Sequence, residues 1–97
     1  MNTREAVAAR ILELCKERGI AINALANEAG VSPSTVYSVL NSKSKNPGIV
    51  TIKEICDGLD ISLRTFFDSL IFDNLEQDIK YAMPRTSTQL MRGAFVS

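Results

Sequence analysis

Apolar residues recur every three to four positions along most of the chain, and no stretch alternates strictly between apolar and polar residues. This spacing predicts amphipathic helices rather than half-buried strands. We therefore expect an all-α chain of five helices, each with one apolar stripe. The expected stripes are Val7, Ile11, Leu14 and Cys15; Ile22, Leu25, Ala26 and Ala29; Val36, Val39 and Leu40; Ile52, Ile55, Cys56 and Leu59; and Leu63, Phe66, Phe67, Leu70 and Ile71.

Helix start and stop signals flank the first three stretches. Asn2 and Glu5 have the spacing of a capping box, and Gly19 follows as a stop, which predicts a helix over residues 3–18. The second helix starts at residue 22 and ends at Gly30. Ser32 caps a third helix, which has Pro at its first position, where the missing N–H costs nothing.

The remaining helices carry similar signals. Thr51 and Glu54 predict a capping box for the fourth helix, and Ser62 predicts the cap of the fifth. The segment Asn46-Pro47-Gly48 predicts a turn in which Gly48 takes a positive φ.

The periodic pattern weakens after residue 72, so we expect one domain over residues 1–72 and an extension over 73–97. Asp73 and Glu76 could cap a sixth helix over 73–83, and residues 84–97 form a tail without a clear period. In the fifth helix we expect Phe66 and Phe67 in the core. Phe72 is expected on the surface, where with Leu70 or Ile71 it would form a dimer patch.

Composition removes most enzyme chemistry. The 97 residues include no His and only two Cys, both at apolar positions, so a histidine base, a zinc site and a disulfide scaffold are excluded. No nucleophile has a base, a glycine loop or a metal set beside it. We expect no enzyme activity, no cofactor, no metal and no small-molecule partner. With no apolar run near the ~20 residues of a membrane span and no secretory signal, we expect a cytoplasmic protein and no membrane partner.

The charge is balanced overall but uneven along the chain. Eleven Lys and Arg match 11 Asp and Glu, which argues against unselective coating of nucleic acid. Residues 1–56 carry a net charge of +2 and residues 57–79 a net charge of −5, so the acidic block lies away from the second and third helices. The neutral total therefore leaves DNA binding open and predicts modest non-specific affinity.

The second and third helices are joined by only three residues, Gly30-Val31-Ser32. Such a tight turn needs a glycine in the left-handed region, and Ala26 is small enough for a close helix crossing. The third helix buries its valines and leaves a polar, short-chained face without acidic residues. This is the surface that a helix entering the major groove needs. Its members are Pro33, Ser34, Tyr37, Ser38 and Asn41.

Residues 21–41 resemble the helix-turn-helix of the lambda-repressor-like, Cro/cI or XRE-type, transcription regulators, with the unit itself over about 22–41. The matching positions are Leu25, Ala26, Gly30, Val31, Ser32, Val36 and Val39. The resemblance extends over residues 3–72 and includes 59–63 with the two phenylalanines that follow. It implies a five-helix DNA-binding domain.

By this resemblance, Pro33, Ser34, Tyr37 and Ser38 contact base edges, with Asn41 near the helix end and Thr35 on the same helix. Ser32 and Asn23 would touch phosphate, and Lys43 and Lys45 would approach the DNA backbone. The family often starts the second helix with Gln after a hydroxyl cap, whereas this chain has Ala21 and Ile22 there. No Arg or Gln lies on the reading face, so selectivity would rest on Tyr37, thymine methyl contacts and DNA shape.

The predicted function is that of a sequence-specific regulator of the phage-repressor type, which binds double-stranded operator DNA in the major groove as a homodimer. Self-association would use the fifth helix or residues 73–97. The alternative is a non-enzymatic protein-interaction or antitoxin-like module built on the same fold. Sequence-selective binding with strong salt dependence distinguishes the first from the second.

Overall fold

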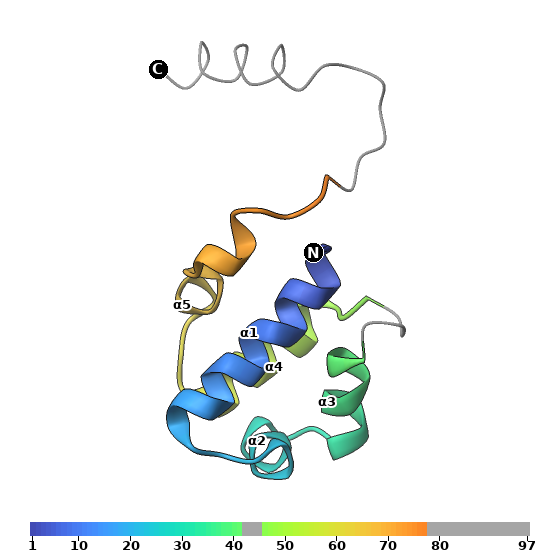
Figure 1. Cartoon of the computed structure of the whole chain (residues 1–97). Helices are drawn as coiled ribbons and strands as arrows, with labels where there is room; N and C mark the ends of the chain where they lie inside the picture. Colours follow the sequence, from blue (N-terminus) through green and yellow to red (C-terminus); the bar gives the residue numbers. More distant parts are fainter. Residues whose placement is uncertain (42–45, 78–97) are drawn as a thin grey trace.

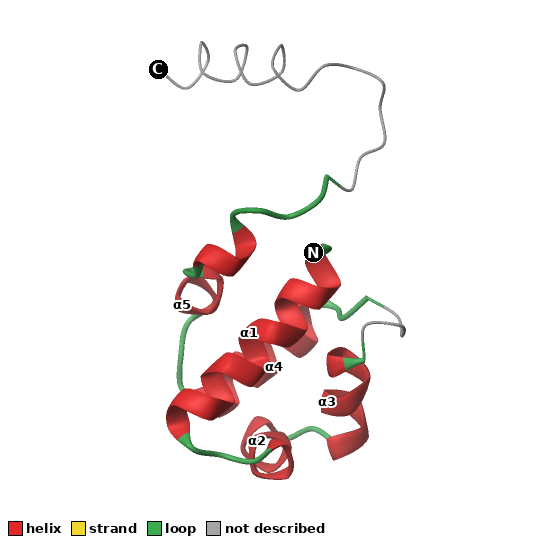
Figure 2. Cartoon of the chain, in the orientation of Figure 1, coloured by secondary structure: helices red, strands yellow, loops and turns green. Residues whose placement is uncertain are grey.

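The computed structural model describes residues 1–41 and 46–77. In these ranges the chain forms five α-helices and one 3-10 turn (Figure 1). They are α1 (Thr3–Arg18), α2 (Ile22–Ala29), α3 (Pro33–Leu40), α4 (Ile49–Leu59), α5 (Leu63–Phe67) and the 3-10 turn η1 (Leu70–Phe72). The described part contains helices and loops but no strand (Figure 2), which confirms the predicted all-α class.

All five helices contribute to a single core. Its buried members all come from the predicted stripes, with Phe66 from α5 completely buried, whereas the stripe residues Phe67 and Leu70 are exposed. They are Val7, Ile11, Leu14, Cys15, Leu25, Ala26, Val36, Val39, Ile52, Ile55, Cys56, Leu59 and Phe66. Helix α3 packs against α1 and α2, and α5 packs against α4. Among the described helices, none is long and apolar enough to cross a bilayer.

The caps of the first three helices follow the sequence signals. Asn2 Oδ1 accepts from the Glu5 N–H at 2.8 Å, and Glu5 Oε1 accepts from the Asn2 N–H at 2.9 Å. Gly19 and Gly30 end α1 and α2 in the left-handed region, with φ of 63° and 71°. The predicted capping box and both glycine stops are therefore confirmed.

The predicted start of α4 is wrong. The helix begins at Ile49, two residues before Thr51, and its N-cap is Gly48 without a side-chain hydrogen bond. Gly48 has a φ of −75° and not the predicted positive value, because it enters the helix from extended backbone. At the other end Asp60 caps the helix with a φ of 57°, a left-handed conformation that a short polar side chain tolerates.

The fifth helix is shorter than predicted. It ends at Phe67, and the chain turns at Asp68 before η1. Ser69 Oγ accepts from the Ile71 N–H at 3.3 Å, a local hydrogen bond that competes with continuation of the helix. Residues 73–77 are not helical, so the predicted helix over 73–83 is wrong there. Its remainder, 78–83, and the predicted tail over 84–97 lie outside the described residues.

Because the helix ends early, two aromatic residues have the opposite exposure to that predicted. Phe67, predicted in the core, is 40% exposed, whereas Phe72, predicted on the surface, packs against the core. The rings of Phe66 and Phe67 lie 5.0 Å apart edge to face, and Phe67 lies 5.0 Å from Phe72. Leu70 is 82% exposed, as the predicted patch requires.

The close packing of α2 against α4 depends on a glycine within α4. A Cβ placed on Gly58 would lie 2.8 Å from the backbone nitrogen of Ala29 and 2.9 Å from its Cα. Helices α2 and α4 therefore touch backbone to backbone, and only glycine fits there. This contact fixes α2 against the core and so sets the position of the turn that leads into α3.

Candidate nucleic-acid interface

The turn between α2 and α3 is built by backbone hydrogen bonds at the end of α2. The Gly30 N–H donates to the Asn27 carbonyl at 3.3 Å, and the Val31 N–H donates to the Ala26 carbonyl at 3.1 Å. Nothing lies within 4 Å of a Cβ placed on Gly30, so its φ, and not a lack of space, calls for glycine. Val31, at the corner between α2 and α3, packs against the core.

The start of α3 is closed by its own cap. Ser32 Oγ accepts from the Thr35 N–H at 3.3 Å and lies 2.9 Å from the Thr35 hydroxyl oxygen. Pro33 occupies the first turn, where it fits without the loss of a hydrogen bond. Val36 and Val39 are buried and hold the inner face of α3 against α1 and α2.

The outer face of α3 is exposed over its whole length. Pro33, Ser34, Tyr37 and Ser38 are all exposed, and the Tyr37 side chain is 52% exposed. Asn41 is also exposed and forms the C-cap, with its N–H donating to the Tyr37 carbonyl at 3.0 Å. The structure thus brings these five predicted contact residues to one helix and its end.

Other predicted contact residues are placed differently. Thr35 is half-buried, and its hydroxyl is engaged by Ser32, so both belong to the cap. Asn23 is exposed in the first turn of α2, as expected for a residue near phosphate. Lys43 and Lys45 lie outside the described residues.

Two helices present N-termini without a side-chain cap, and sequence reasoning assigned no role to either. The N-cap of α2 is Ala21 and that of α4 is Gly48, and neither makes a side-chain hydrogen bond. The first turns of both helices also lack acidic residues, so the partial positive charge of the first N–H groups is not neutralised there. The signal in the sequence is the absence of Ser, Thr, Asp or Asn at these two N-caps.

The start of α4 lies beside α3. A hollow of about 400 Å³ separates them, lined by Thr35 and Ser38 from α3 and by Pro47, Gly48 and Thr51 from the other side. The uncapped end of α4 and the exposed face of α3 therefore border the same depression, which a single extended ligand could cover.

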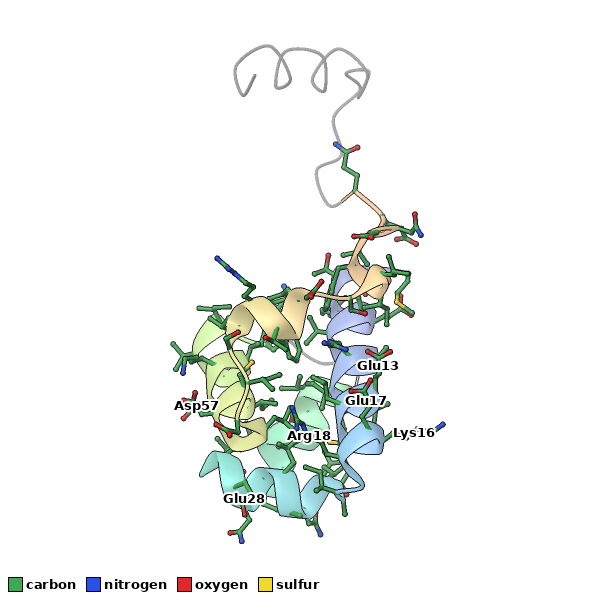
Figure 3. The ribbon with its side chains drawn as sticks, turned by 90° about the vertical axis from the view of Figure 1, so that its left-hand side faces the viewer. Glu13, Lys16, Glu17, Arg18, Glu28 and Asp57 are labelled. Atoms are coloured by element: carbon green, nitrogen blue, oxygen red, sulfur yellow. The ribbon has the colours of Figure 1, made fainter. Side chains whose placement is uncertain are left out.

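This surface is almost free of charge. Residues 19–41 contain one ionisable acidic or basic side chain, Glu28 on α2, and no Lys or Arg. Lys53 on α4 forms an ion pair with Asp57 one turn away. Figure 3 shows that the labelled Glu13, Lys16, Glu17 and Arg18 come from α1, so this cluster of charges lies on another element.

The two cysteines belong to the core and not to a reactive site. Cys15 and Cys56 are free and buried. Burial raises the pKa of both thiols, and Asp57 raises the pKa of Cys56 further against a smaller lowering by Lys53. Thiols with raised pKa values are poor nucleophiles at neutral pH.

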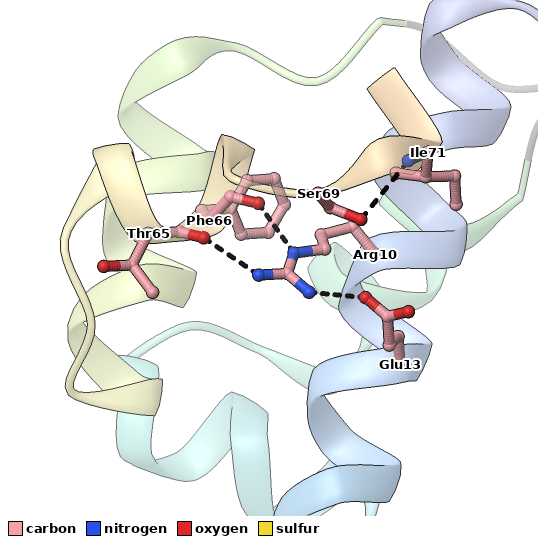
Figure 4. A network of polar contacts seen from close by, with 6 residues as sticks. All are labelled: Arg10, Glu13, Thr65, Phe66, Ser69 and Ile71. Carbon is pink, nitrogen blue, oxygen red and sulfur yellow. Dashed lines mark hydrogen bonds and ion pairs between the residues drawn. The ribbon is translucent and has the colours of Figure 1, made fainter. Parts of the chain in front are cut away.

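Arg10 is a residue whose role sequence reasoning missed. It is buried in α1, with its Nε 2.7 Å from the Phe66 carbonyl and one terminal nitrogen 2.8 Å from the Thr65 carbonyl (Figure 4). Its other terminal nitrogen forms an ion pair with Glu13. Arg10 thereby satisfies carbonyls at the end of α5 and joins that helix to α1. An arginine interrupting an apolar stripe was the available signal.

Comparison with known families agrees with this geometry. Residues 10–68 match the model of the Cro/C1-type HTH DNA-binding domain. The matched segment contains α2, the turn, α3 and α4 complete, and ends just beyond α5. The chain belongs to the Cro/C1-type helix-turn-helix family, which confirms the resemblance seen in the sequence.

Individual relatives show the same fold. The HTH-type transcriptional regulator SinR of Bacillus subtilis is 32% identical over 62 residues, which cover 64% of this chain and 56% of SinR. The chain thus spans about half the length of that relative. The crystal structure of prophage Lp1 protein 11 has a TM-score of 0.68 and 36% identity, over 77% of this chain and all of the other.

A third relative has been solved with DNA. The structure of C.Esp1396I bound to a 19 base pair DNA duplex has a TM-score of 0.65 and 25% identity to this chain. The match covers 75% of this chain and 96% of the other. The free protein, a restriction-modification controller protein, matches with the same TM-score.

Proposed function

We propose that this protein is a sequence-specific DNA-binding transcription regulator, a repressor that acts in the cytoplasm by occupying an operator as a homodimer. The observation that carries the proposal is the exposed face of α3, held outward by two buried valines and the tight turn after α2. A helix presented in this way enters the major groove, and its N-terminal residues contact base edges. The family match and a DNA-bound relative support the same conclusion.

In this proposal the parts of the surface have different tasks. Pro33, Ser34, Tyr37 and Ser38 meet the bases, and Asn41 lies at the far end of the reading helix. Asn23 and the uncapped start of α2 approach phosphate, as does the start of α4 beside α3. Ser32 and Thr35 hold the helix start in place, and the capping hydroxyls border the backbone contacts. Lys43 and Lys45 add charge contacts to the backbone.

One observation favours a second candidate, a protein-interaction or antitoxin-like module. The helix-turn-helix contains no cation over residues 19–41, whereas phosphate contacts usually supply much of the affinity for DNA. A neutral face of Ser, Tyr and Pro also suits contact with another protein.

Selection from random duplexes with the full chain, followed by affinity measurements at two salt concentrations, distinguishes the two functions. A regulator enriches one sequence with two related half-sites and binds it more weakly at high salt. A folded chain that enriches nothing would contradict DNA recognition and favour the interaction module.

Variants then test the assignment of residues. Ser34→Ala with Tyr37→Ala should weaken binding to the selected site by about 10-fold or more and binding to random DNA far less, because base contacts carry the sequence information. Lys43→Ala with Lys45→Ala should weaken both alike and reduce the salt slope by about 2.

Lys16→Ala is the matched control for the lysine pair, because Lys16 is exposed on α1 (Figure 3). It should leave both affinities and the salt slope unchanged. Equal losses on selected and random DNA for the Ser34 and Tyr37 variant would mean that α3 is not the reading helix.

A further inference from the structure

The reading helix lacks every side chain that recognises a base by two hydrogen bonds. Such recognition uses Arg or Lys for guanine, Asn or Gln for adenine, and Glu or Asp for cytosine. Helix α3, Pro33–Leu40, contains none of these residues. Asn41 follows the helix, seven residues beyond Ser34 and about 10 Å further along the axis, so it faces other base pairs.

Two hydroxyl groups at the start of α3 already have hydrogen-bond partners within the protein. The hydroxyls of Ser32 and Thr35 lie 2.9 Å apart, and Ser32 Oγ also accepts from the Thr35 N–H. The exposed groups in the first two turns of α3 are then the Pro33 ring and the side chains of Ser34, Tyr37 and Ser38.

Two of these groups form an apolar stripe. Pro33 and Tyr37 are four residues apart, so their side chains are neighbours on one face of the helix. The Pro33 ring has no polar side-chain atom, and the Tyr37 side chain is 52% exposed. An apolar stripe distinguishes base pairs by the one apolar group in the major groove, the C5-methyl group of thymine.

The same stripe disfavours guanine. Guanine presents two acceptors in the major groove, N7 and O6, and each loses its water when a protein surface covers it. There is no cation over residues 19–41 and no bidentate donor on α3, so an acceptor covered by the Pro33 ring receives no hydrogen bond from it, and a single Ser or Tyr hydroxyl can pair only one of the two. An unpaired, desolvated acceptor costs more than a hydrogen bond returns.

We propose, on the basis of the function proposed above, that α3 reads thymine C5-methyl groups through Pro33 and Tyr37. Each half-site of the operator then carries thymines opposite the first two turns of α3. Sequence selectivity rests there on methyl contacts, with Ser34 as an adaptable hydrogen-bonding neighbour.

Replacement of thymine by deoxyuridine in the selected duplex tests this directly, since it removes the methyl group and leaves the base-pairing edge intact. Each thymine is replaced singly, and affinity is measured with the full chain. One or two positions per half-site should lose about three- to fivefold in affinity, the value of one buried methyl group. Thymines outside the contacted half-sites should show no loss.

A coupled variant ties the loss to the side chain. Tyr37→Ala should bind the thymine duplex more weakly and lose sensitivity to deoxyuridine at one position, whereas Tyr37→Phe, which keeps the ring, should retain it. Lys16→Ala, at an exposed position on α1 away from α3, is the control and should keep the full deoxyuridine effect.

The outcomes separate this inference from the function on which it rests. An enriched duplex whose affinity is insensitive to deoxyuridine, but is reduced by 7-deazaguanine, would overturn methyl reading and leave the regulator proposal intact. The same holds if Tyr37→Ala keeps the full deoxyuridine effect at every position and Pro33→Ala keeps it too. Failure to enrich any duplex would contradict the proposed function, and methyl reading with it.

Discussion

Glycine constrains this chain for two different reasons, backbone conformation and lack of space, which Gly30 and Gly58 illustrate. Gly30 has a φ of 71° with open space around a Cβ, so its backbone conformation is the constraint. Gly58 lies inside a regular helix, where a Cβ would approach the Ala29 backbone to 2.8 Å, so space is the constraint. Gly48 has an ordinary φ and open space, and neither constraint applies.

Gly58→Ala should therefore destabilise the protein, although alanine is the better helix former by about 1 kcal/mol. The new methyl group must push α2 away from α4, and forced overpacking costs about 1–3 kcal/mol. After the gain in helix propensity is subtracted, we expect a net loss of up to about 2 kcal/mol in the free energy of unfolding, measured by urea denaturation.

Gly48→Ala is the matched control and should change the free energy of unfolding by less than about 0.5 kcal/mol. If Gly58→Ala were as stable as the parent, the close contact between α2 and α4 would not exist in solution. Weakened DNA binding by the folded Gly58→Ala variant, under conditions where it remains native, would indicate that the shift of α2 also moves the turn before α3.

Among the helices, α5 is too short to be stable without contacts to the rest of the fold. It has five residues, and isolated helices of this length do not persist in water. Phe66 anchors it in the core, and Arg10 binds the carbonyls of Thr65 and Phe66 from α1. The buried guanidinium donates hydrogen bonds to carbonyls at the end of α5, which would accept from backbone N–H groups if the helix were longer.

Arg10→Met should remove this support while it keeps most of the side-chain volume. The Thr65 carbonyl keeps the hydrogen bond from the Asp68 N–H, whereas the carbonyl of the buried Phe66 loses its bond from Arg10. Loss of these charge-assisted hydrogen bonds should cost about 2–3 kcal/mol in the free energy of unfolding. Amide hydrogen exchange should rise most in residues 63–72, since they depend on Arg10 for their attachment to α1.

Arg18→Met is the matched control, because Arg18 is exposed in the last turn of the same helix. It should change stability by less than about 0.5 kcal/mol. A uniform rise in exchange across all helices, with no preference for residues 63–72, would contradict the local role given to Arg10.

Across the molecule, the sequence predicts those features that depend on interactions between residues close together in the chain. The first three helices, their caps and the outward face around Tyr37 follow from periodicity, capping residues and glycine stops, and the structure has them as expected. The start of α4 and the end of α5 do not follow from these local signals. Ile49 and Val50 are 58% and 70% exposed, so periodicity gave no reason to start the helix there.

Distant contacts explain what the sequence could not show. Arg10 meets its partners 55 and 56 residues away, and Gly58 meets Ala29 across two helices, so no local pattern reports either. Phe67 is exposed, and Phe72 packs against the core, because α5 ends before Asp68. The pattern of apolar residues continues past this position and therefore does not indicate the break. Local chemistry thus predicts α3 and its exposed face, while the contacts that support this helix depend on the assembled fold.

Selectivity for a long DNA site requires more than one copy of α3. One eight-residue helix spans too few base pairs for useful selectivity, and in a two-fold dimer the reading helices would lie about 34 Å apart. Phe67 and Leu70, which lie three residues apart in the sequence on either side of the break after α5, are 40% and 82% exposed. This apolar pair supports a dimer contact in the region predicted from the sequence.

Leu70→Ser, alone and with Phe67→Ser, should lower the affinity for a duplex with two half-sites by about 10-fold or more and leave the affinity for a single half-site unchanged. The reason is that dimer contacts add to affinity only when both half-sites are occupied. Analytical ultracentrifugation of the free chain should show the same loss of self-association. Leu12→Ser, at a 51% exposed position on α1, is the control and should change neither. Unaltered two-site affinity in both variants would place the contact elsewhere, with residues 73–97 as the other region to test.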